Sequence, residues 1–183
     1  MTQTSALKSP SITNLDATPY TLNTEGEGGP GMLRQIGDWI TALDADAATS
    51  TYKFVRLPTT AKVKAVYLLS DVASAGSGDV NVYYSDSIRD GTAPAKQGLA
   101  VQVSASDNKL FGSAISLVAA EGTQEQPVDI TWMNTFTPTM ANQPLWAALG
   151  LSQDPGGMFD IGINVTTAIT TGSIIYMDVR YCD

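Results

Sequence analysis

Alternation of apolar residues in the last third of the chain constrains the fold most strongly. In residues 159–166 every second position is apolar, and in residues 174–181 one parity of positions is apolar throughout. Successive side chains of a β-strand point to opposite faces, so a period of two predicts strands with one buried face. Because only residues 167–173 separate the two segments, we expect them to form a β-hairpin.

Apolar-rich segments of the same kind recur upstream. Residues 52–57, 62–69 and 79–84 are separated by Pro58 and by the Ser- and Gly-rich stretch 74–78. Proline removes a backbone donor and fixes φ, and Gly-rich stretches interrupt strands, so we predict three strands here. The residues of the second strand that we expect to share its buried face are Val63, Ala65, Tyr67 and Leu69.

Other strands are predicted with less regular patterns. These candidates are residues 32–41, 99–103, 110–118 and 128–133. Gly37 interrupts the first of them, where we expect a β-bulge. The apolar run 144–151 is either a strand or one helical turn, because short apolar runs do not separate the two.

Eight or nine strands and no convincing amphipathic helix place the chain in the all-β class. Charged residues make up only 15% of the sequence, whereas exposed helices favour Glu, Lys and Arg. At this strand number we expect an antiparallel two-sheet β-sandwich with the topology of a jelly roll. The predicted core consists of Val63, Ala65, Tyr67, Leu69, Val80, Val82, Phe159, Ile161, Ile163, Val165, Met177 and Val179.

Residues 1–31 differ in composition from the rest of the chain. They are rich in Ser, Thr, Asn and Pro, carry single apolar residues at no sustained period, and end in the Gly-rich run 26–31. Such a segment cannot form a core by itself. We expect either an extended N-terminal arm that docks on another surface or a terminus of no consequence, and we assign the β-sandwich domain to residues 32–183.

Residues with catalytic potential are scarce. The chain contains no histidine, which excludes imidazole metal sites and triads with a His base. Cys182 is the single cysteine, so it forms no intramolecular disulfide, and we expect an inert thiol. The run 26–31 lacks the Lys and Ser/Thr of a phosphate-binding loop. Asp44 and Asp46 alternate as in some calcium loops, but the Gly and Glu that complete such a loop are missing.

Two pairs of carboxylates, Asp44 with Asp46 and Asp154 with Asp160, are interpreted as solvated loop residues, although two carboxylates are also what a glycosidase uses. The sequence therefore predicts no catalytic, cofactor-binding or metal-binding residues and no enzymatic activity.

Charge and hydropathy also limit the partners. The net charge of −8 disfavours nucleic acid, whose binding needs clustered Lys and Arg. The longest uncharged apolar stretches, such as residues 145–151, are too short to cross a bilayer. No apolar leader follows Met1, so we expect synthesis in a reducing cytosol.

Two groups of residues are candidates for binding. Lys53, Arg56, Lys62 and Lys64 supply four of the ten basic residues within twelve positions, and they form either a contact surface for an acidic partner or the solvated face of one sheet. The second group is aromatic and either lines a sugar-binding face or packs in the core. Its members are Trp39, Trp132, Trp146, Tyr83 and Tyr84.

Two pairs of stretches resemble a known family. Residues 26–33 (GEGGPGML) are followed by 51–58 (TYKFVRLP), and residues 143–151 (QPLWAALGL) by 154–161 (DPGGMFDI). Together they resemble a family of small structural proteins of tailed bacteriophages, usually found among head genes. The similarity covers most of the chain from about Gly26 onward, and it transfers no site residues.

The resemblance implies a virion component, specifically a capsid decoration or cement protein on the surface of the shell, made in the cytoplasm of the host bacterium. The implied partners are the major capsid protein and neighbouring copies of the same chain, reached through the arm and exposed strand edges. The alternative is a carbohydrate-binding β-sandwich module of a phage tail or fibre.

Overall fold

The computed structural model describes residues 32–42, 50–70, 76–85, 87–88, 99–101, 109–117 and 127–182. The predicted arm, residues 1–31, and the acidic loop with Asp44 and Asp46 lie outside these ranges. The strands are β1 (Leu33–Thr41), β2 (Thr51–Pro58), β3 (Lys62–Ser70), β4 (Ser77–Tyr84), β5 (Lys109–Ser116), β6 (Val128–Asp129), β7 (Met158–Thr167) and β8 (Ile174–Cys182). The described helical elements are η1 (Met140–Asn142), a 3-10 turn, and α3 (Leu145–Ala148).

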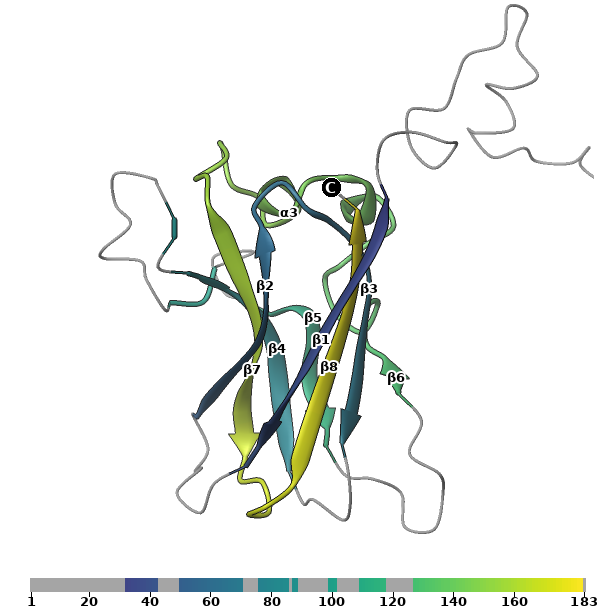
Figure 1. Ribbon diagram of the computed structural model, residues 1–183, viewed down its shortest axis with the longest axis vertical. Coiled ribbons are helices and arrows are strands. Elements are labelled where there is room, and N and C mark those ends of the chain that lie inside the picture. The colour runs from purple at the N-terminus through teal and green to yellow at the C-terminus, as the bar shows by residue number, and fades with distance from the viewer. Residues whose placement is uncertain are drawn as a thin grey trace, which may run out of the picture. The chain divides into compact units, whose positions relative to one another are not determined.

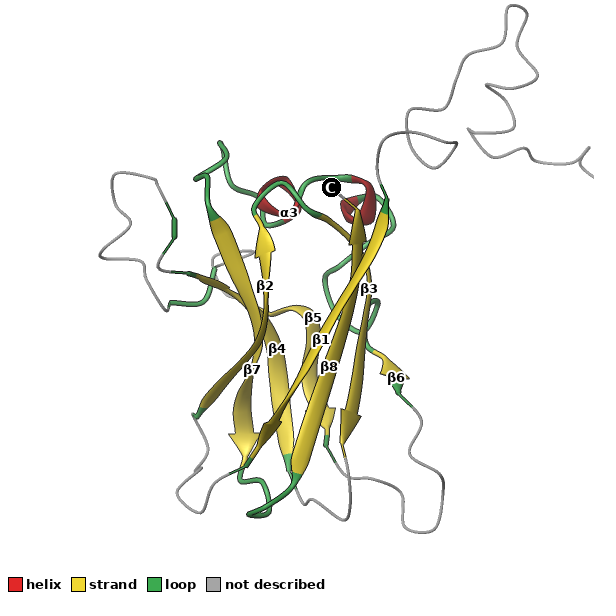
Figure 2. Cartoon of the chain, in the orientation of Figure 1, coloured by secondary structure: helices red, strands yellow, loops and turns green. Residues whose placement is uncertain are grey.

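The strands form two four-stranded antiparallel sheets (Figures 1 and 2). Sheet A has the order β1-β8-β3-β6 and sheet B the order β2-β7-β4-β5. Pairs β1 with β8, β2 with β7, β3 with β6, and β4 with β5 all run antiparallel. The strands therefore pair as in one long hairpin that has been folded over. The predicted all-β, two-sheet sandwich is confirmed.

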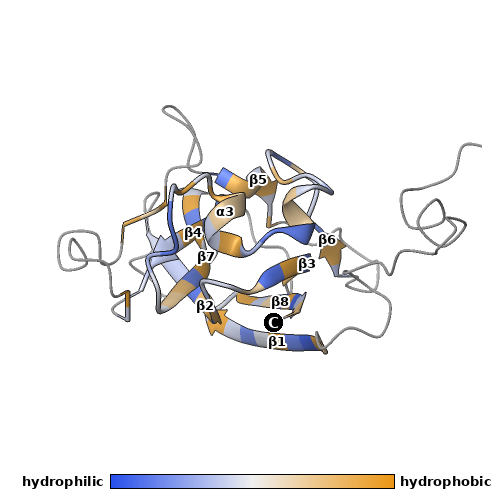
Figure 3. Ribbon diagram, turned by 90° about the horizontal axis from the view of Figure 1, so that it is seen from above, coloured by the Kyte–Doolittle hydropathy of each residue, from blue (hydrophilic) through white to orange (hydrophobic). Residues whose placement is uncertain are grey.

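The apolar core lies between the two sheets, which are seen as two layers from the end that α3 covers (Figure 3). The predicted core positions on β4, β7 and β8 are all buried, namely Val80, Val82, Phe159, Ile161, Ile163, Val165, Met177 and Val179. Burial of such side chains stabilises each by about 1.5–3 kcal/mol. The ambiguous segment 144–151 contains the helical turn α3. The Leu145 amide donates to the Ala61 carbonyl at 2.8 Å, which anchors α3 to the chain before β3, and the Leu145 side chain is buried.

The predicted hairpin between the last two strands is wrong. β7 lies in sheet B between β2 and β4, whereas β8 lies in sheet A between β1 and β3. The connection between them is long enough to cross from one layer to the other, a separation of about 10 Å. It is fastened beside the end of β1, where the Ala42 amide donates to the Ser173 carbonyl at 2.8 Å and the Gly172 amide to the Ala42 carbonyl at 2.9 Å.

The buried face predicted for β3 is partly wrong. The pairing of β3 with β8 shifts register between Val63 and Ala65. A bulge of this kind adds one residue to one strand and reverses the facing of every residue beyond it. Val63, Val66 and Leu68 are therefore buried, while the predicted core residues Ala65, Tyr67 and Leu69 lie on the outer face and are half-buried.

The bulge predicted at Gly37 is also wrong, because β1 pairs with β8 without interruption from Leu33 to Thr41. Gly37 instead makes room for Tyr176, whose hydroxyl would collide with a Cβ at this position. Two predicted strands are shorter than expected. Of residues 99–103 the structure describes 99–101, where Ala100 forms an isolated bridge with Tyr83, and residues 128–133 contribute only the two residues of β6.

Candidate interaction surfaces

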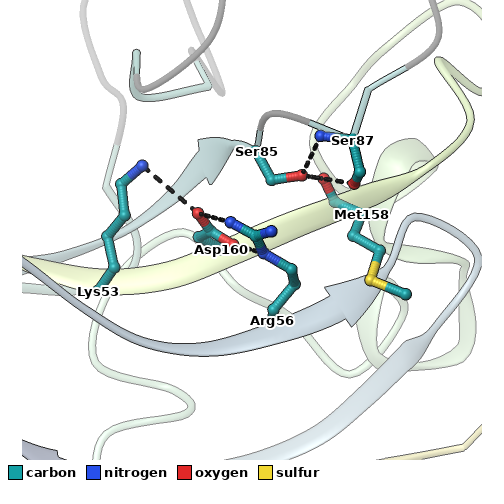
Figure 4. A network of polar contacts seen from close by, with 6 residues as sticks. All are labelled: Lys53, Arg56, Ser85, Ser87, Met158 and Asp160. Carbon is teal, nitrogen blue, oxygen red and sulfur yellow. Dashed lines mark hydrogen bonds and ion pairs between the residues drawn. The ribbon is translucent and has the colours of Figure 1, made fainter.

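The outer face of sheet B carries a polar network centred on the buried residue Asp160 of β7 (Figure 4). Arg56 Nε donates to Asp160 Oδ1 at 2.6 Å, and Arg56 Nη2 donates to Oδ2 at 3.1 Å. Lys53 Nζ lies 3.4 Å from the same Oδ2. Residues three apart on a regular strand face opposite ways, but β2 shifts register between Lys53 and Val55. That irregularity brings both cations to one carboxylate, and their positive charges compensate its negative charge.

The network continues across β4 and β5. Asp79 Oδ1 accepts from the Ala114 amide at 2.7 Å, and Lys109 Nζ lies 3.3 Å from Asp79 Oδ2. Between the two carboxylates, Asn81 Nδ2 donates to the Tyr83 hydroxyl at 3.4 Å. Burial raises the pKa of Tyr83 above its ordinary value, an effect that its hydrogen bonds to Asn81 and Thr51 oppose. The charged groups of this face thus satisfy one another.

Ser85, directly after β4, forms a second group of polar contacts near the Asp160 ion pairs (Figure 4). Its hydroxyl donates to the Met158 carbonyl at 2.6 Å, and it accepts from the Ser87 amide at 3.2 Å. These contacts tie the chain that leaves β4 to the start of β7. The hydroxyl of Ser85 therefore serves local structure, since both of its hydrogen-bonding capacities are engaged.

The outer face of sheet A has a different character. Its outward positions on the three strands β1, β8 and β3 are Leu33, Gln35, Gly37, Trp39, Thr41, Ile174, Tyr176, Asp178, Arg180, Cys182, Ala65, Tyr67 and Leu69. Leu33 is 64% exposed, Trp39 63% and Ile174 39%. Trp39 pairs directly with Tyr176, and Tyr176 with Leu69, so an apolar row crosses all three strands. We call these thirteen residues the outer face of sheet A.

A small polar cluster occupies the middle of this face. Gln35 Nε2 donates to Asp178 Oδ2 at 3.1 Å, and Arg180 Nε lies 3.8 Å from the same oxygen. The guanidinium of Arg180 lies 4.8 Å from the centre of the Tyr67 ring, within the range of a cation–π interaction. Asp178 Oδ1 and Arg180 Nε are the two side-chain polar atoms in the described part of the chain that are buried without a hydrogen-bond partner.

The four clustered basic residues do not share one surface. Lys53 and Arg56 lie on sheet B, whereas Lys62 and Lys64 lie on β3 of sheet A. Lys64 Nζ also donates to the Ala141 carbonyl at 2.8 Å and to Asn142 Oδ1 at 2.9 Å, which ties it to η1. Both interpretations placed the four residues on one face, and the division between two sheets contradicts both.

The aromatic candidates also separate. Tyr83 and Tyr84 are buried and Trp146 packs partly buried against the core, as the core interpretation expects. Trp39 and Trp132 are exposed, but Trp39 lies on β1 and Trp132 follows β6, at opposite edges of sheet A. Trp132 stacks on Phe136 with ring centres 5.5 Å apart. These five residues therefore form no single platform.

The remaining candidates are placed as follows. Asp154 accepts from the Gly156 amide at 2.8 Å in the loop before β7, so it is a solvated loop residue as expected. The same expectation is wrong for Asp160, which lies within β7 and is buried in its ion pairs. Cys182 is a half-buried free thiol at the end of β8. Within the described ranges, no three acidic or Cys side chains converge on a point where they would hold a metal ion. None of the described helices is long and apolar enough to span a membrane.

The outer face of sheet A was missed by the sequence interpretation, although a signal for it exists. In residues 174–181 the outward parity also contains the apolar residues Ile174 and Tyr176. A sheet whose outer face is solvated would place polar residues there. Apolar residues on both parities therefore indicate a strand whose outer face is also suited to contact.

Comparison with known proteins adds little to this description. No protein-family model and no curated protein matches the sequence. Among solved structures, a chain of the "Cyanophage Pam1 capsid asymmetric unit" is similar over 91% of this chain and 96% of that chain, at 16% sequence identity and a TM-score of 0.49. This similarity is too low to assign a family or a function.

Proposed function

We propose that this protein is a non-enzymatic structural component of the virion of a tailed bacteriophage, specifically a decoration or cement protein on the surface of the capsid shell. The observation that carries the proposal is the outer face of sheet A, which exposes Trp39, Leu33 and Ile174 around a polar centre. Trp, Tyr and Arg are the residues that dominate protein–protein contacts. The phage assignment itself is supported by the sequence resemblance of residues 26–33, 51–58, 143–151 and 154–161.

The jelly-roll topology belongs to the same proposal. Its support is the strand pairing, in which the first four strands each pair with one of the last four in reverse order. An eight-stranded jelly roll consists of two sheets with this kind of folded-over connectivity. The sheets then leave four edge strands, β1 and β6 in sheet A and β2 and β5 in sheet B.

Contacts with the shell are proposed to run through these strand edges and through the arm. Edge strands present backbone donors and acceptors that a neighbour is able to pair with. The arm, residues 1–31, contains single apolar residues that would each fill a small pocket on another subunit, and its glycines leave its exit direction free. The partners are the major capsid protein and neighbouring copies of this chain.

Binding to particles tests the proposal. Particles stripped of this protein are mixed with the purified full chain, and the bound amount is measured by cosedimentation. We expect saturable binding at a fixed copy number per particle. A variant that lacks residues 1–29 should keep its melting temperature and bind fewer copies. Absence of binding by the full chain would contradict the shell assignment, and an unfolded deletion variant would contradict the independence of the arm from the core.

A carbohydrate-binding module of a tail or fibre is the second candidate. The observation in its favour is the exposed indole of Trp39 beside Tyr176, because sugar rings stack on exposed aromatic side chains. A glycan array separates the two functions. The structural role predicts no bound saccharide, whereas a module predicts a ligand that protects Trp39 fluorescence from quenching.

A further inference from the structure

We infer that the outer face of sheet A is a self-association surface on which a second copy of the chain packs face to face. The inference deepens the proposed function, because it specifies where neighbouring copies touch. It is tested with the free protein, so its outcome is separate from that of the particle-binding experiment. Three properties of the face support it: its apolar content, its charge pattern and the symmetry between its two ends.

The face exposes apolar side chains that a second copy would bury. Leu33, Trp39 and Ile174 are exposed, and the half-buried Tyr176 and Leu69 lie between and beside them. At a rise of about 3.3 Å per residue and a strand spacing of about 4.8 Å, the three strands give a footprint of about 30 Å by 14 Å, or about 400 Å². The exposed apolar side chains lie toward the two ends of this footprint, with Leu33 at one end and Trp39 and Ile174 at the other, and exposed apolar patches often mark interaction sites.

The charge pattern suits a second copy of the same face. Asp178 on β8 lies in one row with Asp129 on β6, because both are aligned with Tyr67 of β3. Arg180 follows one row further along β8, and Lys62 lies opposite Cys182 in the row after that. Asp129 and Lys62 lie beside the thirteen residues of the outer face of sheet A, and together with Asp178 and Arg180 they make one half of the contact area acidic and the other basic, with charges that sum to zero. The charges at this contact therefore attract, whereas the net charge of −8 on each whole chain opposes association at low salt.

A two-fold axis across the strands between the rows of Asp178 and Arg180 would bring the two charged halves together. The acidic half of each copy then faces the basic half of the other, so that Asp178 meets Arg180 of the second copy. The side chain of Arg180 is 43% exposed, so part of its guanidinium is accessible to a second copy. A two-fold contact is reciprocal, so the pairing occurs twice.

The same axis aligns the two most exposed apolar residues of β1. Trp39 and Leu33 lie at equal distances on either side of it, since Gln35 and Gly37 are the β1 residues aligned with Arg180 and Asp178. Trp39 of each copy would therefore cover Leu33 of the other. The arrangement removes the largest exposed side chain of the face from water without requiring a change in either sheet.

The size of the contact sets its strength. Two faces of about 400 Å² bury about 800 Å² together, below the roughly 1,200 Å² of stable complexes. The pair is therefore weak in solution. On a shell it gains from multivalency, because each copy is held beside its neighbours by a second attachment. A saccharide or the shell protein itself is the competing occupant of this face.

Sedimentation equilibrium of the full chain over about 10 µM to 1 mM tests the inference. We expect a reversible monomer–dimer equilibrium that Trp39→Lys and Arg180→Glu each weaken about ten-fold or more, since Trp and Arg are typical hot spots. Trp132→Lys is the matched control: this second exposed tryptophan lies at the opposite edge of sheet A. It should leave the equilibrium unchanged. The melting temperature of each variant is measured first, and only variants that melt at the wild-type temperature enter the comparison of dimer dissociation constants.

Several results would overturn the inference. A wild-type chain that stays monomeric up to 1 mM does so, and so does a Trp132→Lys variant that weakens dimers as much as Trp39→Lys. Loss of particle binding by Trp39→Lys with an unaffected dimer equilibrium would assign the face to the shell protein. Dimers without particle binding would support the inference and contradict the proposed function.

Discussion

Truncation of two neighbouring leucines on β3 tests the register of the sandwich. Leu68 is 4% exposed and belongs to the core, whereas Leu69 lies on the outer face of sheet A and is half-buried. The two residues have the same side chain and adjacent positions, so their truncation to alanine differs only in the face that is changed. Uninterrupted alternation from Val63 would place Leu69 in the core, and the bulge between Val63 and Ala65 reverses this.

The expected magnitudes differ clearly. Leu→Ala in a well-packed core costs about 2–5 kcal/mol, because the lost transfer free energy adds to the cost of the cavity. We expect about 3 kcal/mol for Leu68→Ala. Full burial of a leucine is worth about 1.5–3 kcal/mol, so a half-buried site that leaves no internal cavity should lose about 1 kcal/mol or less. For a domain of this size the melting temperature should fall by about 6–12 °C in Leu68→Ala and by no more than about 4 °C in Leu69→Ala.

Urea unfolding followed by circular dichroism at low micromolar concentration gives the free energies, and the low concentration removes any contribution from self-association. Equal m-values for both variants confirm that the unfolding reactions are comparable. A larger loss in Leu69→Ala than in Leu68→Ala would refute the bulge and the register of β3.

Three further predictions concern sheet B. Gly162→Ala should cost about 1–3 kcal/mol or more in urea unfolding, because its Cβ would collide with the Tyr52 carbonyl and the backbone of β2 must move; wild-type stability would contradict this packing. Asp160→Asn should cost about 1–2 kcal/mol, since Arg56 is 45% exposed and partly screened, and the deficit should shrink in 1 M salt; a salt-independent deficit would contradict an electrostatic origin. The raised pKa of Tyr83 favours its neutral form, so the associated stability is complete below the ordinary pKa of 10.0 and is lost as the pH rises through the folded value. Wild type should therefore lose more stability than Tyr83→Phe above about pH 10, and parallel pH profiles would contradict this.

Much of the fold follows from the sequence, because alternation and turn residues act locally. The segments 159–166 and 174–181 differ by only a residue or two from β7 and β8. Their assignment to a hairpin failed because alternation identifies a strand and one face, but not the neighbour in the sheet. Which sheet a central strand enters depends on pairings with β2 and β4 or with β1 and β3, which are distant in sequence.

The predicted core failed where the backbone departs from regular geometry. The bulge in β3 is invisible in the pattern, because Val66 and Leu68 are as apolar as the Tyr67 and Leu69 that were predicted in their place. In β2 a similar irregularity brings Lys53 and Arg56 to one carboxylate. The outer face of sheet A escaped prediction because the signal within residues 174–181 marks one strand only, whereas the face combines three strands that are distant in sequence.

A reconstruction of intact virions from the source of this sequence, with the chain traced into the density, tests the central claim most directly. The proposed function predicts the β-sandwich on the outer surface of the capsid shell, in contact with the major capsid protein and with neighbouring copies. A chain absent from the particle, or located in a tail fibre with a saccharide against Trp39, would contradict it.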